Sequence, residues 1–433
     1  MELDTAKGMR DINPDEELFR EQIVRKMQVI FARYGFMPLN TPIIERYDVL
    51  SAKFAAGEES DAMSEVYKLK DNGNRELGLR FDLTVPFARY VGMNRTLKMP
   101  FKRYQIGKVY RDAPIKMGRY REFTQCDVDI VGTTDLMADA TCINVALDVY
   151  KELGVDATIG VNNRKFLFSL FVKNGIPEDK LESAIMSIDK LNKLSVDEIV
   201  KETNAKGLNE DSIRKIIDIV RFQGSNDEKL NFFAAQLSVD DPGIVELKEL
   251  LSYFPNDDRV VFVPSLARGL GYYTGTVFEV YSKEKPEIGA ISAGGRYDEL
   301  VDSYLESVGR GIEDRTYPAV GISFGLDRTV DVLKKLDKIN FIKTNVKLFI
   351  VPIGKQKESF AIAQQFRDAG INVDIDLMKR GPSKNFAYAD SYKIPFVAVI
   401  GENELNENVI TLKNMADGTE EKLSVADAIN KLK

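Results

Sequence analysis

The stretch Phe101–Gly132 reads FKRYQIGKVYRDAPIKMGRYREFTQCDVDIVG and decides the fold. It predicts two strands, Arg103–Arg111 and Arg119–Ile130, which are joined by the seven residues Asp112–Gly118. That connection is longer than an ordinary hairpin turn, and long connections inside compact domains are usually functional or mobile. We therefore expect a hairpin whose connecting loop is functional or mobile.

The second of these strands has two chemically different faces. Because side chains alternate along a strand, one face carries Cys126, Val128 and Ile130, which suit a core. The other face carries arginines, a ring, an amide and carboxylates: Arg119, Arg121, Phe123, Gln125, Asp127 and Asp129. Arginine binds phosphate or carboxylate in a bidentate manner, whereas Gln and Asp accept hydrogen bonds from an ammonium group or a ring N–H. This face predicts a zwitterion bound beside a polyanion. The alternative is a half-solvated sheet face whose charges cancel.

The composition predicts a globular protein of two or three domains, because 433 residues are too many for one compact core. No apolar run reaches the length of about 18 residues that a membrane helix needs, and residues 1–20 show no signal-peptide pattern. We therefore expect no membrane association and a cytoplasmic location. Cys126 and Cys142 form no CxxC pair, so both are predicted to be reduced core thiols.

The charge and the histidine content restrict the chemistry. The chain contains no histidine, which excludes Ser–His, Cys–His and His–metal mechanisms. The net charge of −7 argues against a protein that coats nucleic acid with its whole surface. Between Arg95 and Arg121, however, the sequence contains nine Lys or Arg residues and only one Asp, and such a basic stretch can bind phosphates.

A second polar cluster lies in Gly78–Tyr90, which reads GLRFDLTVPFARY. Read as a strand, it places Arg80, Asp82 and Thr84 on one face. We expect this face to join the polar face of the Arg119–Ile130 strand. A surface strand with scattered charges is the alternative.

Three further arginines are flanked by glycines. Arg268 lies in a glycine-rich bend, Arg296 follows Gly294–Gly295, and Arg328 follows Gly325 where a strand is predicted to pass into a helix. None of these stretches fits a P-loop or a GxGxxG fingerprint, so a phosphate site here would depend on the arginines themselves. The alternative for each arginine is a solvated turn.

The order of elements predicts a helical insertion and a separate C-terminal domain. A helix is expected to begin at Asn13–Pro14 and end at Gly35. The next segment, Phe36–Glu45, contains two prolines and is predicted to lie at a sheet edge. From Lys165 to Tyr253 helical periods dominate, and strands alternate with helices after Lys334. The predicted divisions are 1–164, 165–253, 254–334 and 345–433.

Together these motifs resemble the histidyl-tRNA synthetases, a family of class II aminoacyl-tRNA synthetases. The arginine-rich hairpin is similar to class II motif 2, PAVGISFGLDR to motif 3, and the first helix with the Pro42 segment to motif 1. LARGLGYYTGTVFE and AGGRYD resemble two signatures specific to this family, and KGMRD at Lys7–Asp11 supports them. The C-terminal domain, including IPFVAVIGENEL, is similar to the family's anticodon-binding domain.

The resemblance implies an α+β fold. Residues 1–164 (motifs 1 and 2) and 254–334 (the two signatures and motif 3) would form the antiparallel-sheet catalytic domain of a class II synthetase. Residues 165–253 would form a helical insertion in it. Residues 345–433 would form the C-terminal α/β anticodon-binding domain.

The resemblance also implies roles for site residues. Asp82, Thr84 and Gln125 would hold the α-amino group of histidine. Asp129 and Tyr273 would read the two imidazole nitrogens, and Tyr272 would also belong to the histidine site. The residues expected to act on ATP or in catalysis are Arg111 on the α-phosphate, Arg119 on the outer phosphates, Arg328 on adenine, and Arg268 between the substrate carboxylate and the α-phosphate. Lys116 and Arg121 would contact the acceptor end of the tRNA.

The implied activity is ATP-dependent ligation of histidine to tRNA-His through a histidyl-adenylate. ATP would be a substrate, Mg²⁺ would accompany it, the protein would hold no metal of its own, and motif 1 would form a homodimer interface. The alternative is a catalytically silent, histidine-sensing regulatory subunit of ATP phosphoribosyltransferase. Such subunits lack the anticodon domain, whereas this chain carries a C-terminal α/β pattern.

Overall fold

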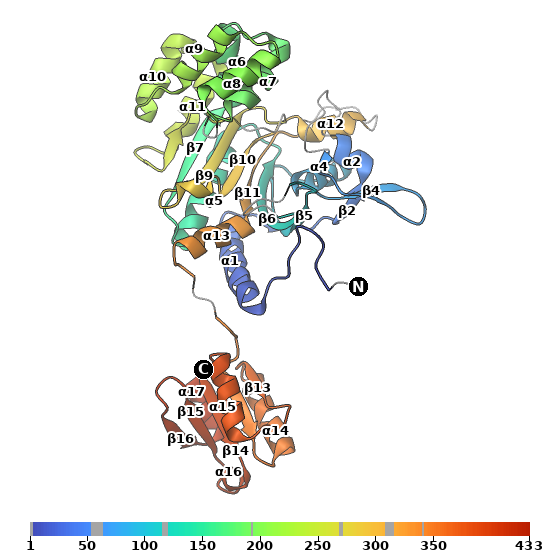
Figure 1. The fold of residues 1–433 in the computed structure, drawn as a ribbon, viewed down its shortest axis with the longest axis vertical. Coiled ribbons are helices and arrows are strands. Elements are labelled where there is room, and N and C mark those ends of the chain that lie inside the picture. Colours follow the sequence, from blue (N-terminus) through green and yellow to red (C-terminus); the bar gives the residue numbers. More distant parts are fainter. Residues whose placement is uncertain are drawn as a thin grey trace. The chain divides into compact units, whose positions relative to one another are not determined.

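The computed structural model describes residues 3–52, 64–114, 120–191, 194–267, 272–307, 316–339 and 342–433. The chain divides into two compact units, which are described separately. The larger unit comprises Met1–Asp11 and Ile23–Ile339, and the smaller comprises Ile12–Gln22 and Asn340–Lys433. Figure 1 shows the ribbon with its helices and strands labelled.

An eight-stranded sheet forms the centre of the larger unit, with strand order β1-β5-β6-β11-β10-β9-β7-β8. It is antiparallel through β5-β6-β11-β10-β9-β7, and a parallel pair closes each edge. Its strands are β1 Met37–Pro38, β5 Phe101–Tyr110, β6 Glu122–Val131, β7 Ala157–Asn163, β8 Val260–Phe262, β9 Thr276–Ser282, β10 Ser292–Arg296 and β11 Ala319–Gly325. The proline-containing segment after the first helix contributes the edge strand β1, as predicted.

The hairpin of β5 and β6 is formed as predicted, with small differences at its ends. The second strand begins at Glu122, and residues 115–119 of the connection lie outside the described residues. Cys126 and Ile130 are buried, so the predicted core face of β6 is confirmed. Cys126 and Cys142 are buried free thiols, which confirms the prediction for both.

The expected strand through Gly78–Tyr90 is wrong beyond its start. A three-stranded sheet contains β2 Ile44–Arg46, β3 Lys68–Lys70 and β4 Glu76–Leu79 in the order β2-β4-β3. The chain then turns, and helix α4 runs from Thr84 to Met93. The turn is stabilised because Oδ1 of Asp82 accepts a hydrogen bond of 2.9 Å from the N–H of Val85 in the first helical turn. Pro86 is tolerated there because N–H groups of the first turn have no partner within the helix.

Several helices within residues 1–339 begin or end at familiar signals. The first helix, α1 Pro14–Arg33, begins as predicted, and Gly35 follows it with a positive φ of 76°. Ser195 and Ser225 form capping boxes with Glu198 and Glu228. The remaining helices up to the insertion are α2 Tyr47–Ala52, α4 and α5 Met137–Glu152, and those after it are η2 Pro286–Ile288, α12 Leu300–Ser307 and α13 Leu326–Lys335.

A group of helices connects β7 to β8 and gathers at one end of the sheet (Figure 1). They are α6 Arg164–Lys173, η1 Glu178–Lys180, α7 Leu181–Ile188, α8 Val196–Ala205, α9 Glu210–Val220, α10 Asn226–Gln236 and α11 Pro242–Ser252. Their apolar faces pack on one another and on β7 and β8.

The smaller unit has its own five-stranded sheet, in the order β13-β12-β14-β15-β16. Leu348 and Phe349 on β12 belong to two different hydrophobic clusters, so both faces of that strand are buried. The strands are β12 Leu348–Pro352, β13 Val373–Ile375, β14 Phe396–Ile400, β15 Ile410–Asn414 and β16 Glu420–Leu423. The helices are α14 Gln356–Asp368, α15 Pro382–Ser391, α16 Glu402–Asn406 and α17 Val425–Leu432. No helix in the described parts of the chain is long and apolar enough to cross a membrane.

Candidate functional site

A cavity of about 150 Å³ lies over the middle of the large sheet, and the predicted histidine-binding residues gather around it. All six of those side chains line this cavity: Asp82, Thr84, Gln125, Asp129, Tyr272 and Tyr273. They come from four parts of the chain, namely the turn before α4, the α4 N-terminus, β6 and the segment before β9. Arg111, which directly follows β5, also lines it. We call this space the small cavity.

Strand β6 supplies three hydrogen-bond acceptors to the small cavity. Gln125, Asp127 and Asp129 are spaced two residues apart, so the pleat turns all three toward the same space. Gln125 Oε1, Asp127 Oδ1 and Asp129 Oδ2 are buried and have no hydrogen-bond partner among the described residues. Buried polar atoms are rarely left without a donor, so this set predicts a ligand that carries several N–H groups.

Asp129 is held by residues that the sequence did not indicate as site residues. Arg103 lies opposite it in the β5–β6 register, is 0% exposed, and places Nη2 2.8 Å from Asp129 Oδ2. The hydroxyl of Tyr297, just after β10, donates a hydrogen bond to Asp129 Oδ1. Tyr297 belongs to the AGGRYD signature, which was the available signal for it. Arg103 had no such signal.

Burial dominates the electrostatics of the β6 carboxylates. It raises the pKa of Asp127 to about 7, with Asp129 adding to the rise and Arg103 opposing it. Burial also raises the pKa of Asp129, while Arg103 and the hydrogen bond from Tyr297 lower it. The small cavity therefore favours a cationic ligand, whose charge would let both carboxylates ionise.

Glycines let the neighbouring strands and Tyr273 close around the small cavity. A Cβ atom at Gly295 would lie 2.8 Å from the Tyr273 ring and 2.6 Å from the carbonyl oxygen of Thr276. Only glycine fits at this distance, because real Cβ atoms do not approach backbone so closely. The second glycine of AGGRYD, Gly295, therefore lets the sheet pack against the tyrosine.

A second cavity, of about 900 Å³, adjoins the first. Arg111 and Gln125 line both cavities, and Arg328 at the start of α13 lines the larger one. The guanidinium of Arg111 donates 3.0 Å to the carbonyl oxygen of Phe81 and lies over the Phe123 ring. Arg328 Nη1 donates 2.6 Å to the carbonyl oxygen of Ala290. The volume suits a nucleotide-sized ligand.

Of the other predicted arginines and the lysine, Arg121 belongs to the described residues, and it lines neither cavity. Arg268, Arg119 and Lys116 lie outside the described residues. Arg121 pairs with Asp112 at 2.9 Å and donates to the carbonyl oxygen of Ala113 at 3.2 Å. Its predicted role at the tRNA end therefore remains a prediction.

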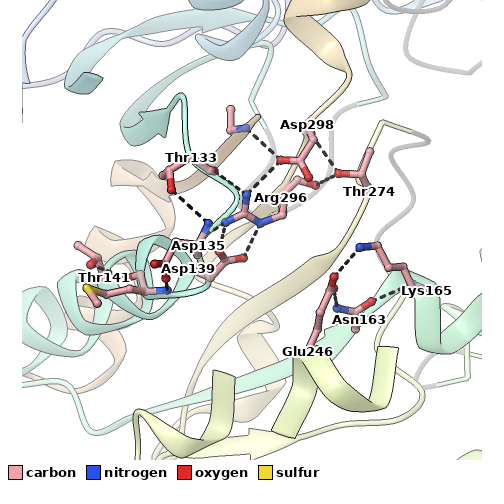
Figure 2. Close-up of polar contacts among 12 residues, drawn as sticks. Thr133, Asp135, Asp139, Thr141, Asn163, Lys165, Glu246, Thr274, Arg296 and Asp298 are labelled. Carbon is pink, nitrogen blue, oxygen red and sulfur yellow. Dashed lines mark hydrogen bonds and ion pairs between the residues drawn. The ribbon is translucent and has the colours of Figure 1, made fainter. Parts of the chain in front are cut away.

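Arg296 is buried, so the alternative of a solvated turn is wrong for it. It is 3% exposed at the end of β10 and pairs with Asp139 of α5 (Figure 2). It also donates 2.9 Å to the carbonyl oxygen of Thr133 and 3.1 Å to Asp298. The carbonyl oxygen of Arg296 accepts from the N–H of Thr274, so this network fixes the chain directly after Tyr272 and Tyr273.

A small polar cavity beside a larger one lined by arginines suits an enzyme that activates a small zwitterion with a nucleotide. Comparison with known proteins agrees. The family model described as Histidyl-tRNA synthetase matches residues 8–329, and that described as Anticodon binding domain matches residues 347–433. The chain belongs to the histidyl-tRNA synthetase family.

Relatives and solved structures cover the whole chain. "Histidine--tRNA ligase 1" of Bacillus cereus is 38% identical over 98% of both sequences. The crystal structure of histidyl-tRNA synthetase from Nostoc sp. PCC 7120 superposes with a TM-score of 0.84 at 30% identity, covering 100% of this chain and 99% of that one. The predicted fold class is confirmed.

A further structural neighbour bears on the alternative function. A Bacillus halodurans structure titled as an ATP phosphoribosyltransferase regulatory subunit/histidyl-tRNA synthetase has a TM-score of 0.74 at 20% identity, covering 93% of this chain and 98% of that one. At that identity the likeness shows the fold alone. The full-length relatives and the match to an anticodon-binding domain favour the ligase over the regulatory subunit.

Proposed function

We propose that the small cavity binds histidine, that the larger cavity binds ATP, and that the chain ligates histidine to tRNA through a histidyl-adenylate. Three buried acceptors of β6 carry this proposal: none accepts a hydrogen bond among the described residues, and Asp129 Oδ2 has the ion pair with Arg103. Histidine brings an ammonium group and a ring N–H, which are the donors that such acceptors need. The adjoining larger cavity would bring the α-phosphate of ATP beside the substrate carboxylate.

Histidine would lie with its ammonium group toward Asp82, Thr84 and Gln125 and its ring toward Asp129 and Tyr273. Gln125 is oriented for this because its Nε2 donates 2.9 Å to Ser323 Oγ, which leaves Oε1 toward the ligand. Tyr273 is 5% exposed and is held by the close packing of Gly295. A site that hydrogen-bonds a polar ring rejects analogues that lack its N–H groups.

ATP would be held by arginines. Arg111 lines both cavities, so its guanidinium is suited to the α-phosphate at their junction. Arg328 is suited to stack on adenine, because a planar guanidinium packs on an aromatic ring. Arg268 and Arg119 complete the proposal on the resemblance alone, with Arg268 between carboxylate and α-phosphate and Arg119 on the outer phosphates.

The first step needs no protein base. The ionised carboxylate of histidine attacks the α-phosphorus, a new oxygen–phosphorus bond forms, and pyrophosphate leaves. Charge develops on the phosphoryl oxygens, and fixed arginines stabilise it electrostatically. A chain without histidine residues can therefore catalyse this step.

In the second step a terminal ribose hydroxyl of the tRNA attacks the carbonyl carbon of the adenylate, and AMP leaves. The proton of the hydroxyl passes to a phosphate oxygen of the adenylate, which departs with AMP. Lys116 and Arg121 remain the proposed contacts of the tRNA acceptor end.

Mg²⁺ would enter with ATP. The described residues contain no cluster of three metal-ligating side chains. Glu279 and Asp327 line the larger cavity, however, and one or two carboxylates with substrate phosphates are the donors that Mg²⁺ takes. When bound, the ion would neutralise charge on the outer phosphates.

We also propose that the protein is a cytoplasmic homodimer. The edge region around β1 and β2 leaves Met37, Ile43 and Ile44 exposed by 63%, 43% and 50%. An apolar sheet edge of this kind is suited to packing against a second copy. Sedimentation at micromolar concentration would give twice the monomer mass, and a monomer would contradict this part.

The test of the function is histidine-dependent ATP–pyrophosphate exchange without tRNA, measured against a panel of other amino acids. Exchange with histidine alone is expected. Asp129→Asn is the matched variant and should lose most of its exchange at low histidine, through a raised KM for histidine, while it still binds ATP. Histidine binding without exchange would contradict the ligase and favour the regulatory alternative.

A further inference from the structure

The buried guanidinium of Arg103 contacts Asp129 and Leu83, which belong to the two parts of the chain that would bind the ring and the ammonium group of histidine. Its Nη2 lies 2.8 Å from Asp129 Oδ2 and donates a hydrogen bond of 3.1 Å to the carbonyl oxygen of Leu83. Leu83 stands between Asp82 and Thr84, the pair proposed for the ammonium group. One side chain therefore links the ring-reading carboxylate to the ammonium-binding turn.

We propose that Arg103 is a positioning residue for histidine recognition, which holds Asp129 in register with the Asp82–Thr84 turn and favours its charged form. This inference deepens the proposed function and rests on it. Arg103 does not line the small cavity, so it would act through Asp129 and the turn rather than by touching histidine.

The surroundings of Arg103 fit such a role. It is 0% exposed, and its guanidinium lies 4.5 Å above the ring of Phe87 on α4. Its Nε and Nη1 have no hydrogen-bond partner within the described residues. A buried cation with so few hydrogen bonds is costly and is compensated here by the adjacent carboxylate, because opposite charges stabilise each other strongly at low dielectric.

The contact also leaves Asp129 competent to bind. Nη2 donates to Leu83, and its 2.8 Å approach to Asp129 Oδ2 is an ion pair without hydrogen-bond geometry, so this oxygen can still accept a hydrogen bond. Arg103 thus supplies charge while the acceptor stays available for a ring N–H. Tyr297 occupies the other oxygen and prevents the carboxylate from turning.

Asp129 would depend on this cation for its charge. The titratable groups that face it are Arg103 on β5, Tyr297 after β10, Asp82 before α4, Asp127 on its own strand and the Cys142 thiol on α5. Burial and Asp82 raise the pKa of Asp129, and Arg103 lowers it. Without Arg103 the carboxylate would take up a proton at a higher pH.

Arg103→Met and Arg103→Lys test the inference in the exchange assay with the full chain. Arg103→Met should raise the KM for histidine about tenfold or more, with the KM for ATP nearly unchanged, because loss of a charged partner acts on the ring-reading group. Arg103→Lys should recover part of the loss, since an ammonium restores the charge but not both contacts. Arg164→Met is the matched control: Arg164 is a buried arginine paired with Glu182 in the helical insertion, and its loss should lower Tm without changing either KM.

Two measurements separate positioning from simple destabilisation. In an Asp129→Asn background, Arg103→Met should add little further rise in the KM for histidine, because its partner is already neutral. The ratio of the variant's KM for histidine to that of the wild type should also grow as pH falls. This growth should begin at a higher pH for Arg103→Met than for Arg103→Lys, which keeps the charge. Additive effects, or KM values for histidine and ATP that change together, would overturn the inference.

If Arg103→Met does not fold, Arg103→Lys carries the same comparison. A wild type without histidine-dependent exchange would overturn the proposed function, whereas normal wild-type exchange with an unchanged KM in both variants would overturn this inference alone.

Discussion

Gly321 of β11 lies opposite Asp129 of β6, and a Cβ atom at residue 321 would stand 2.1 Å from Asp129 Oδ1. That oxygen already accepts from Tyr297, so it has no space into which to move. The glycine is therefore required by the carboxylate beside it and also by the backbone, because the same Cβ atom would lie 2.8 Å from the carbonyl oxygen of Val128.

Gly321→Ala should displace Asp129 and raise the KM for histidine by about tenfold to a hundredfold, because small displacements of a positioned group are costly. The KM for ATP should change little. Gly107→Ala is the matched control, since its Cβ would crowd only the guanidinium end of the Arg80 side chain and would make an ordinary 3.7 Å contact with Leu83. Equal kinetic losses in the two variants would show that the effect is general.

Asp127 makes stability depend on pH. Its pKa is raised from 3.8 to about 7 in the fold, so between these values the folded state holds a proton that the unfolded state has lost. Stability therefore falls as pH rises from about 4 to about 7. In Asp127→Asn this contribution is absent, so the Tm of the variant relative to wild type should rise across that range. A Tm difference that does not vary with pH would contradict the raised pKa.

Tyr273→Phe should lower kcat/KM for histidine about tenfold, because the ring contact loses a hydroxyl that cannot be replaced. The KM for ATP should stay within about twofold. Tyr150→Phe removes another buried hydroxyl; Tyr150 lines neither cavity, although its hydrogen-bond partner at 2.6 Å, Ser292, lines the larger one. It serves as control and should cost stability only. Equal effects on both substrates would remove Tyr273 from the histidine site.

Arg328→Ala should raise the KM for ATP about tenfold through loss of guanidinium stacking, while the KM for histidine stays the same. Arg328→Lys keeps the charge but not the plane and should recover little. Arg259→Ala removes an arginine that pairs with Asp257 outside both cavities and should leave both KM values unchanged. Full recovery by lysine would mean that charge rather than stacking is what matters.

Arg296→Met should lower the free energy of unfolding by about 3–5 kcal/mol, because Asp139 would keep a buried, unpaired charge. Replacing both partners, as Arg296→Met with Asp139→Leu, should restore much of the loss. Chemical denaturation of the single and double variants measures this. A double variant less stable than the single one would contradict the pairing shown in Figure 2.

Period-2 alternation was sufficient to predict which face of β6 carries Gln125 and Asp129, because strand geometry depends on local sequence alone. Asp82 and Thr84 line the small cavity, as the polar spacing predicted. The predicted backbone was wrong, because these residues lie in a turn and at the start of a helix rather than on a strand. Strand β16 was missed because Glu420–Leu423 has no apolar alternation.

The residues that complete the site could not be predicted in this way. Arg103 looked like one more cation of a basic stretch, and only the β5–β6 register places it opposite Asp129. Tyr297 reaches the same carboxylate from 168 residues away. Pairings of this kind depend on how the sheet assembles, which no local pattern records.

The alternation on β6 joins recognition to folding. If β6 slipped by one residue against its neighbours, Cys126 and Val128 would face the small cavity, and the carboxylates would enter the core. A molecule in the wrong register can therefore neither pack nor select histidine. It follows that titration of histidine-binding sites in a preparation counts its correctly registered molecules, so that the assay of function also reports the quality of refolded material.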